Sequence, residues 1–107
     1  MTGHNEYMKL ELAKNYITDH LYPEELLAQL AEEASELAHA ALKLRRVLDG
    51  ENPTPVDRQT AVAALKEEVA DVTLLVNILR LDSDPGEIRA IMDHKLLRWQ
   101  ARLMERE

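Results

Sequence analysis

Two groups of carboxylates, 35 residues apart, are the part of this sequence best suited to chemistry. The stretch "EEASE" spans residues 32–36, and "EVAD" spans residues 68–71. Laying residues 30–37 over residues 65–72 matches Glu33 with Glu68 and Glu36 with Asp71. The two members of each pair are three residues apart and therefore share one face of a helix. The sequence thus predicts an internal repeat of two helices whose common feature is acidic.

The spacing of these pairs also suits an antiparallel helical hairpin. Glu33 and Asp71 are symmetric about Asn52, and so are Glu36 and Glu68. Glu33 would then face Asp71 across the hairpin, and Glu36 would face Glu68 in the same register. One such pair alone would indicate only a solvated helix face, but two pairs at mirrored depth favour a shared site.

Carboxylates brought together in this way repel one another. At about 5 Å and an effective dielectric constant near 20, each pair of charges costs roughly 3 kcal/mol. The cluster must therefore be protonated, spread into water or neutralised by cations. An all-oxygen ligand set in a chain without cysteine favours a hard ion. We expect Mg²⁺, with Mn²⁺ as the alternative.

Four helices are expected to position these residues. The pattern of apolar and breaker residues predicts helices over about 5–20, 23–48, 58–81 and 85 to near the C-terminus. The stretch "DGENPTPVD" at 49–57 is expected to be a loop, and Ser83 or Asp84 should cap the last helix. The predicted fold is all-α, with a central antiparallel helical hairpin in a single domain, residues 1–107.

The apolar residues of the two central helices recur three and four positions apart, as in coiled coils. The third helix is apolar on nearly all sides between Val72 and Leu79. A single short chain offers few neighbours for such a helix, so we expect the helical bundle to be completed by homo-oligomerisation. The expected apolar seams are Leu27, Leu30, Ala34, Leu37, Ala41, Leu44 and Leu48 on the second helix, and Val62, Leu65, Val69, Val72, Val76 and Leu79 on the third.

Composition excludes several classes of function. The chain has 20 acidic and 13 basic residues and a formal net charge of -7, which argues against general nucleic-acid binding. Its longest apolar run is too short to span a membrane. The N-terminus lacks the apolar core of a signal peptide. We therefore expect a cytoplasmic protein with neither a nucleic-acid nor a membrane partner.

At these two motifs the sequence resembles the MazG-type all-α nucleoside triphosphate pyrophosphohydrolases. That family combines an E-E-x-x-E motif on one helix with an E-x-x-D motif on the next. The resemblance covers roughly residues 23–100. It implies a homodimer or homotetramer and Mg²⁺-dependent hydrolysis of a nucleoside triphosphate between the α- and β-phosphates. By position, the implied metal ligands are Glu33, Glu36, Glu68 and Asp71. Glu32 lies next to that face, either as a group that supports the ligands or as a base for the attacking water.

Cationic residues would contact the triphosphate. The resemblance points to the last helix, where "HKLLRWQAR" offers Lys95 and Arg98, with Arg102 on the same stripe. Lys43, seven residues after Glu36, shares the face of that carboxylate and is a further candidate. These cations could equally be the ordinary basic C-terminal half of a helix, which the helix dipole favours. The segment departs from the Lys-Asn…Arg pattern of relatives.

Two other interpretations remain open. Glu36 and His39 form the E-x-x-H motif of di-iron bundles, but the repeat offers Asp71 and Leu74 instead. A non-catalytic helical module that binds metal or nucleotide would share the bundle without turnover. The residues do not identify the preferred base or sugar.

Overall fold

A computed structural model describes residues 2–50 and 56–107, and these residues form four helices and no strand. The helices are α1 (Thr2–His20), α2 (Pro23–Asp49), α3 (Arg58–Ile78) and α4 (Pro85–Glu105). The prediction of an all-α chain is confirmed. Most of the expected loop at 49–57 lies outside the described residues.

The helix ends follow from local sequence. Pro23 begins α2, where its missing N–H is not needed, and Gly50 ends it in the left-handed region at φ 67°. Asp57 caps α3 by accepting a 2.7 Å hydrogen bond from the Thr60 N–H. Asp84 caps α4 through the Gly86 N–H, as the sequence predicts for one of its two candidates. α3 ends at Ile78, three residues earlier than expected, and Arg80 follows with φ 61°.

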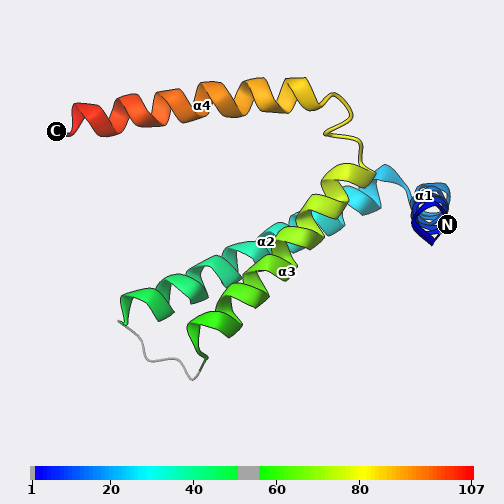
Figure 1. Ribbon diagram of the computed structural model, residues 1–107, viewed down its shortest axis with the longest axis horizontal. Helices are drawn as coiled ribbons and strands as arrows, with labels where there is room; N and C mark the ends of the chain where they lie inside the picture. Colours follow the sequence, from blue (N-terminus) through cyan, green and yellow to red (C-terminus); the bar gives the residue numbers. More distant parts are fainter. Residues whose placement is uncertain (1, 51–55) are drawn as a thin grey trace.

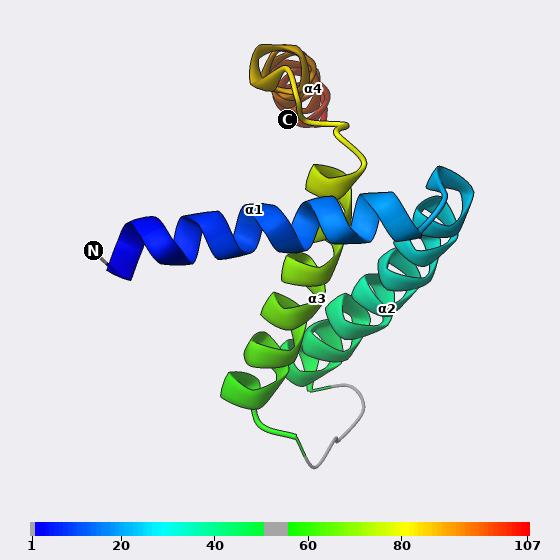
Figure 2. The same cartoon turned by 90° about the vertical axis from the view of Figure 1, so that its right-hand side faces the viewer.

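The closest packing in the molecule is between α2 and α3, which lie side by side and run in opposite directions (Figure 1). α1 crosses the end of this pair in the second view (Figure 2). At this crossing Leu26, Leu75 and Ile78 form a small buried core, and Ile17 of α1 packs against it. Leu10 and Ala13 of α1, and Leu21 just after it, are exposed. Ile17 is the α1 residue that packs against this core, and most of the described residues of α1 are exposed.

The apolar seam between α2 and α3 differs from the prediction. Leu27 and Leu48 are exposed, as is Val69 on α3, although the sequence pattern put them in the seam. The seam positions of α2 are Leu30, Leu37 and Leu44, as predicted, together with Leu26, Glu33, Ala40 and Val47. On α3 they include Ala61, Leu65, Glu68, Val72 and Leu75. Both repeats therefore place a glutamate inside the seam, Glu33 or Glu68, where the prediction had selected the next residue, Ala34 or Val69.

α4 extends away from the other helices in both views (Figures 1 and 2). Every residue of α4 is exposed, including its large apolar side chains. No helix among the described residues is long and apolar enough to cross a membrane.

Candidate metal centre

Three of the four carboxylates named by the sequence converge between α2 and α3. One oxygen from each of Glu33, Glu68 and Asp71 lies within 4.8 Å of the other two. Glu33 and Glu68 are half-buried because they occupy the seam, whereas Asp71 is exposed at its edge. We call these three residues the acidic cluster. Their separation is close enough for one cation to contact all three.

Glu36, the fourth predicted ligand, is exposed on α2. It lies close enough to Glu68 for its negative charge to raise the pKa of that group. Glu36 is not part of the acidic cluster. It is one turn along α2 from Glu33 and borders the cluster on the side of Glu68.

The environment of Glu68 disfavours its ionised form. Burial raises the pKa of Glu68 most, followed by a hydrogen bond with Glu33 and the negative charges of Glu33, Asp71 and Glu36. One carboxylate oxygen, Oε2, is shielded from solvent and has no hydrogen-bond partner among the described residues. A buried acceptor without a donor is unfavourable. A cation or a proton would satisfy it, so the donor set fits a hard metal ion.

Glu33 is held in place from its own helix. Gln29, one turn earlier on α2, donates a 3.0 Å hydrogen bond from Nε2 to Glu33 Oε1. Gln29 was not singled out in the sequence, although its i, i+4 spacing to Glu33 was a usable signal.

An apolar hollow of about 340 Å³ adjoins the acidic cluster. Glu33 and Asp71 form part of its wall, and the remainder is mainly apolar. All three of α1, α2 and α3 contribute to it. Its lining consists of Ile17, Leu21, Leu26, Gln29, Glu33, Asp71, Leu74, Leu75 and Ile78. The hollow could accept a flat apolar group next to bound metal.

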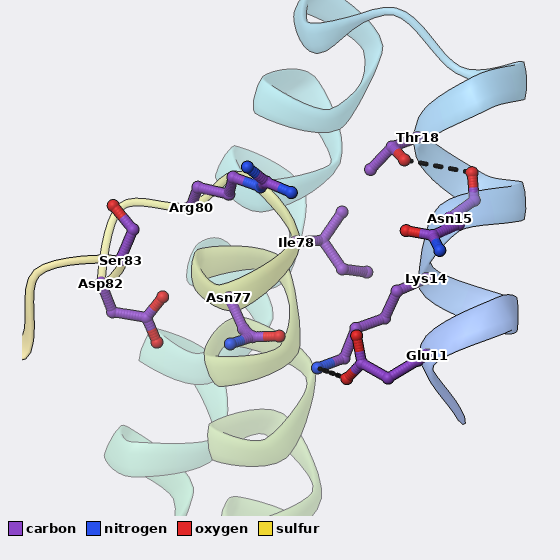
Figure 3. A pocket seen from close by; sticks show the side chains of 9 residues that line it. All are labelled: Glu11, Lys14, Asn15, Thr18, Asn77, Ile78, Arg80, Asp82 and Ser83. Atoms are coloured by element: carbon purple, nitrogen blue, oxygen red, sulfur yellow. Dashed lines mark hydrogen bonds and ion pairs between the residues drawn. The ribbon is translucent and has the colours of Figure 1, made fainter. Parts of the chain in front are cut away.

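A second hollow, of about 260 Å³, lies between α1 and the end of α3 (Figure 3). Its wall is polar and carries charges of both signs. Lys14 Nζ lies 3.4 Å from Glu11 Oε1 on α1, while Arg80 and Asp82 come from the segment after α3. Asn77, which is half-buried on α3, lines this hollow and not the acidic cluster.

The other predicted site residues are more scattered. Glu32 and Lys43 are exposed on α2. Lys95 and Arg98 are exposed on α4, and within one chain α4 extends away from α2 and α3 (Figure 1). The structure therefore brings together three of the four predicted metal ligands, Glu33, Glu68 and Asp71, but it does not bring the α4 cations to them. His39 is exposed on α2.

Comparisons of this chain with protein families, curated proteins and solved structures found no match.

Proposed function

We propose that this protein is a Mg²⁺-dependent nucleoside triphosphate pyrophosphohydrolase, which hydrolyses its substrate to a nucleoside monophosphate and pyrophosphate. The observation that carries the proposal is the convergence of Glu33, Glu68 and Asp71 within 4.8 Å of one another. The proposal also rests on the resemblance of the two acidic motifs to the MazG-type enzymes. Mn²⁺ is a second candidate for the same oxygen ligands.

Different residues of α2 and α3 would bind the cation and accept the proton. Glu33, Glu68 and Asp71 would hold the cation, with Glu36 beside them as the fourth ligand. Bound Mg²⁺ neutralises phosphate oxygens and lowers the pKa of a coordinated water. Glu32 would accept the proton of the attacking water. The water oxygen bonds to the α-phosphorus, the bond to the bridging oxygen breaks, and pyrophosphate leaves.

The apolar hollow supports a nucleotide as the substrate class. It adjoins Glu33 and Asp71, so a nucleobase placed there would leave its phosphates beside the acidic cluster. Cations would offset charge on the leaving pyrophosphate. Lys43 on α2 and Lys95 and Arg98 on α4 remain the candidates. Because α4 extends away from α2 and α3, the two α4 residues would have to come from another copy in a homodimer or homotetramer.

The direct test measures pyrophosphate released from a panel of nucleoside and deoxynucleoside triphosphates, with Mg²⁺ and with EDTA. We expect release only with the metal, and a loss of at least about a hundredfold in Glu68→Gln, since it removes a metal ligand. Glu67→Gln is the matched control because Glu67 is its exposed neighbour. Absence of cleavage across the panel, or equal activity of the two variants, would refute the proposal.

A non-catalytic helical module that binds metal or nucleotide is the second candidate. The observation that favours it is the large apolar surface that α4 leaves exposed, which is typical of an interaction surface. Under this alternative, nucleotide or Mg²⁺ would raise the melting temperature without any release of pyrophosphate.

A further inference from the structure

The second hollow, between α1 and the segment that follows α3, is lined almost entirely by polar side chains (Figure 3). We call it the polar hollow. Among the described residues, Ile78 is the one apolar member of its wall. Its volume of about 260 Å³ is that of roughly nine waters, at about 30 Å³ each in the liquid. The polar hollow therefore suits a polar ligand smaller than a nucleotide, and no residue of the acidic cluster lines it.

Several groups in this wall have no partner within the chain. Lys14 pairs with Glu11 along α1, with 3.4 Å between Nζ and Oε1. The guanidinium of Arg80, the carboxylate of Asp82 and the side-chain amide of Asn77 make no hydrogen bond or ion pair among residues 2–50 and 56–107. Asn77 and Asp82 are also half-buried. A ligand that hydrogen-bonds to them would replace contacts with water that burial restricts.

Arg80 occupies a backbone position that favours glycine. It lies two residues after the end of α3 and has φ 61°. The N–H groups of Arg80 and Leu81 donate hydrogen bonds of 3.0 and 3.1 Å to the carbonyl oxygens of Asn77 and Val76. This is the Schellman arrangement, in which glycine is the usual residue at the left-handed position. Arginine is less stable there than glycine, so its side chain needs another reason to be present. Figure 3 shows this side chain in the wall of the polar hollow, extending toward α1.

The formal charges of the wall cancel, and this selects the class of ligand. Lys14 and Arg80 are cationic, whereas Glu11 and Asp82 are anionic. A polyanion such as a triphosphate would meet two carboxylates here, but a zwitterion would find a complementary group for each of its charges. Arginine binds a carboxylate through two parallel hydrogen bonds, and aspartate accepts hydrogen bonds from an ammonium group. The amide of Asn77 can both donate and accept, so it can contact further polar atoms of the ligand.

We propose that the polar hollow binds a small zwitterion with one carboxylate and one ammonium group, of which a free α-amino acid is the simplest form. Arg80 would bind the carboxylate, and Asp82 would bind the ammonium group. The ligand would thereby join α1 to the segment that leads into α4. This proposal does not depend on hydrolysis and stands apart from the proposed function.

Titration calorimetry of the native chain with a panel of α-amino acids tests the ligand class. Each amino acid is compared with its decarboxylated amine and its deaminated acid, which each lack one of the two charges. We expect at least one amino acid to bind about tenfold or more tightly than both relatives, since each relative loses a charge-assisted hydrogen bond. Absence of amino-acid binding, or equal binding of a single-charge relative, overturns the proposal. So does tighter binding of inorganic phosphate, which would make the polar hollow an anion site.

Two variants test whether the ligand binds in the polar hollow. Arg80→Gly removes the guanidinium and relieves the left-handed backbone, so we expect a higher melting temperature and an amino-acid affinity at least about tenfold lower. A variant that is more stable and binds less cannot owe the loss to unfolding. Asp82→Asn should lower the affinity by a similar factor and abolish the preference over the deaminated acid.

Asp19→Asn is the matched control, because it removes a carboxylate from an exposed position of α1 outside the polar hollow. We expect it to bind amino acids as the native chain does. Affinity that survives either Arg80→Gly or Asp82→Asn overturns the proposal, and so does an affinity that falls equally in Asp19→Asn.

Discussion

Glu68 is energetically unfavourable in its seam position, yet it is suited to binding a cation. It occupies an apolar seam position, and its Oε2 is shielded and has no hydrogen-bond partner among residues 2–50 and 56–107. Three neighbouring carboxylates raise its pKa. A leucine there would pack without these costs. Groups with perturbed pKa values cluster at functional sites, which makes Glu68 the residue that most clearly separates a site from a solvated face.

Replacing Glu68 with glutamine should therefore stabilise the metal-free protein. Glutamine keeps the shape, removes the charge and can donate a hydrogen bond to Glu33. We expect the melting temperature in EDTA to rise by roughly a few degrees. Addition of Mg²⁺ should raise the melting temperature of the native chain but not that of Glu68→Gln. Glu67→Gln, at the exposed neighbouring position, should behave like the native chain in both conditions. Equal responses of the two variants would contradict a metal site at Glu68.

The stability of the metal-free protein should also depend on pH through Glu68. Its pKa is raised in the folded chain, so between the unfolded and folded pKa values the folded state binds more protons. Stability is therefore lost as the pH rises through this range and regained as the pH falls. We expect the difference in melting temperature between Glu68→Gln and the native chain to be larger at about pH 7.5 than at about pH 5. A difference that does not change with pH would contradict this.

At the scale of the elements, the sequence predicted which helices form but misplaced the seam of α2. A pattern based on apolar residues selects Leu27 and then Ala34. It passes over Glu33, because a glutamate in an apolar seam is unfavourable. The structure uses Leu26 and Glu33 instead. Hydrophobic periodicity cannot predict a seam position that is occupied by an energetically unfavourable carboxylate. The symmetry of the two acidic motifs did identify Glu33 and Glu68, because it depended on the spacing of the carboxylates and not on hydrophobicity.

Adjacent leucines on α2 allow this register to be measured. Leu26 is 5% exposed and packs with Leu75 and Ile78, whereas Leu27 is 50% exposed. We expect Leu26→Ala to lower the free energy of unfolding by about 2–5 kcal/mol, since it leaves a cavity in the small core. Leu27→Ala should cost well under half as much. Denaturant unfolding with a common m-value would compare them, and a larger cost at Leu27 would restore the register predicted from the sequence.

For the molecule as a whole, most of the apolar surface that the sequence supplies has no partner within one chain. The buried core at the crossing of α1, α2 and α3 consists of Leu26, Leu75 and Ile78, while the whole of α4 is exposed. The position of α4 could not be predicted from local patterns. The spacing of its apolar residues indicates an amphipathic helix. No local signal says whether the surface that covers these residues belongs to the same chain. The same holds for the α4 cations Lys95 and Arg98, whose distance from the acidic cluster is set by the position of α4.

If a second copy covers α4, folding and association must be coupled. The melting temperature should then rise with protein concentration, because the unfolded chains are favoured by dilution. Each tenfold increase in chain concentration should add about 1.4 kcal/mol to the free energy of unfolding of a dimer. Leu96, unlike Leu97, lies on the same side of α4 as Met92, Trp99 and Leu103. Leu96→Glu should therefore melt at a lower temperature that no longer depends on concentration, and Leu97→Glu should keep the native dependence. Calorimetry over about a hundredfold range of concentration would measure this. A native melting temperature that stays constant over the range would mean that the chain is stable alone, with the apolar side chains of α4 in water.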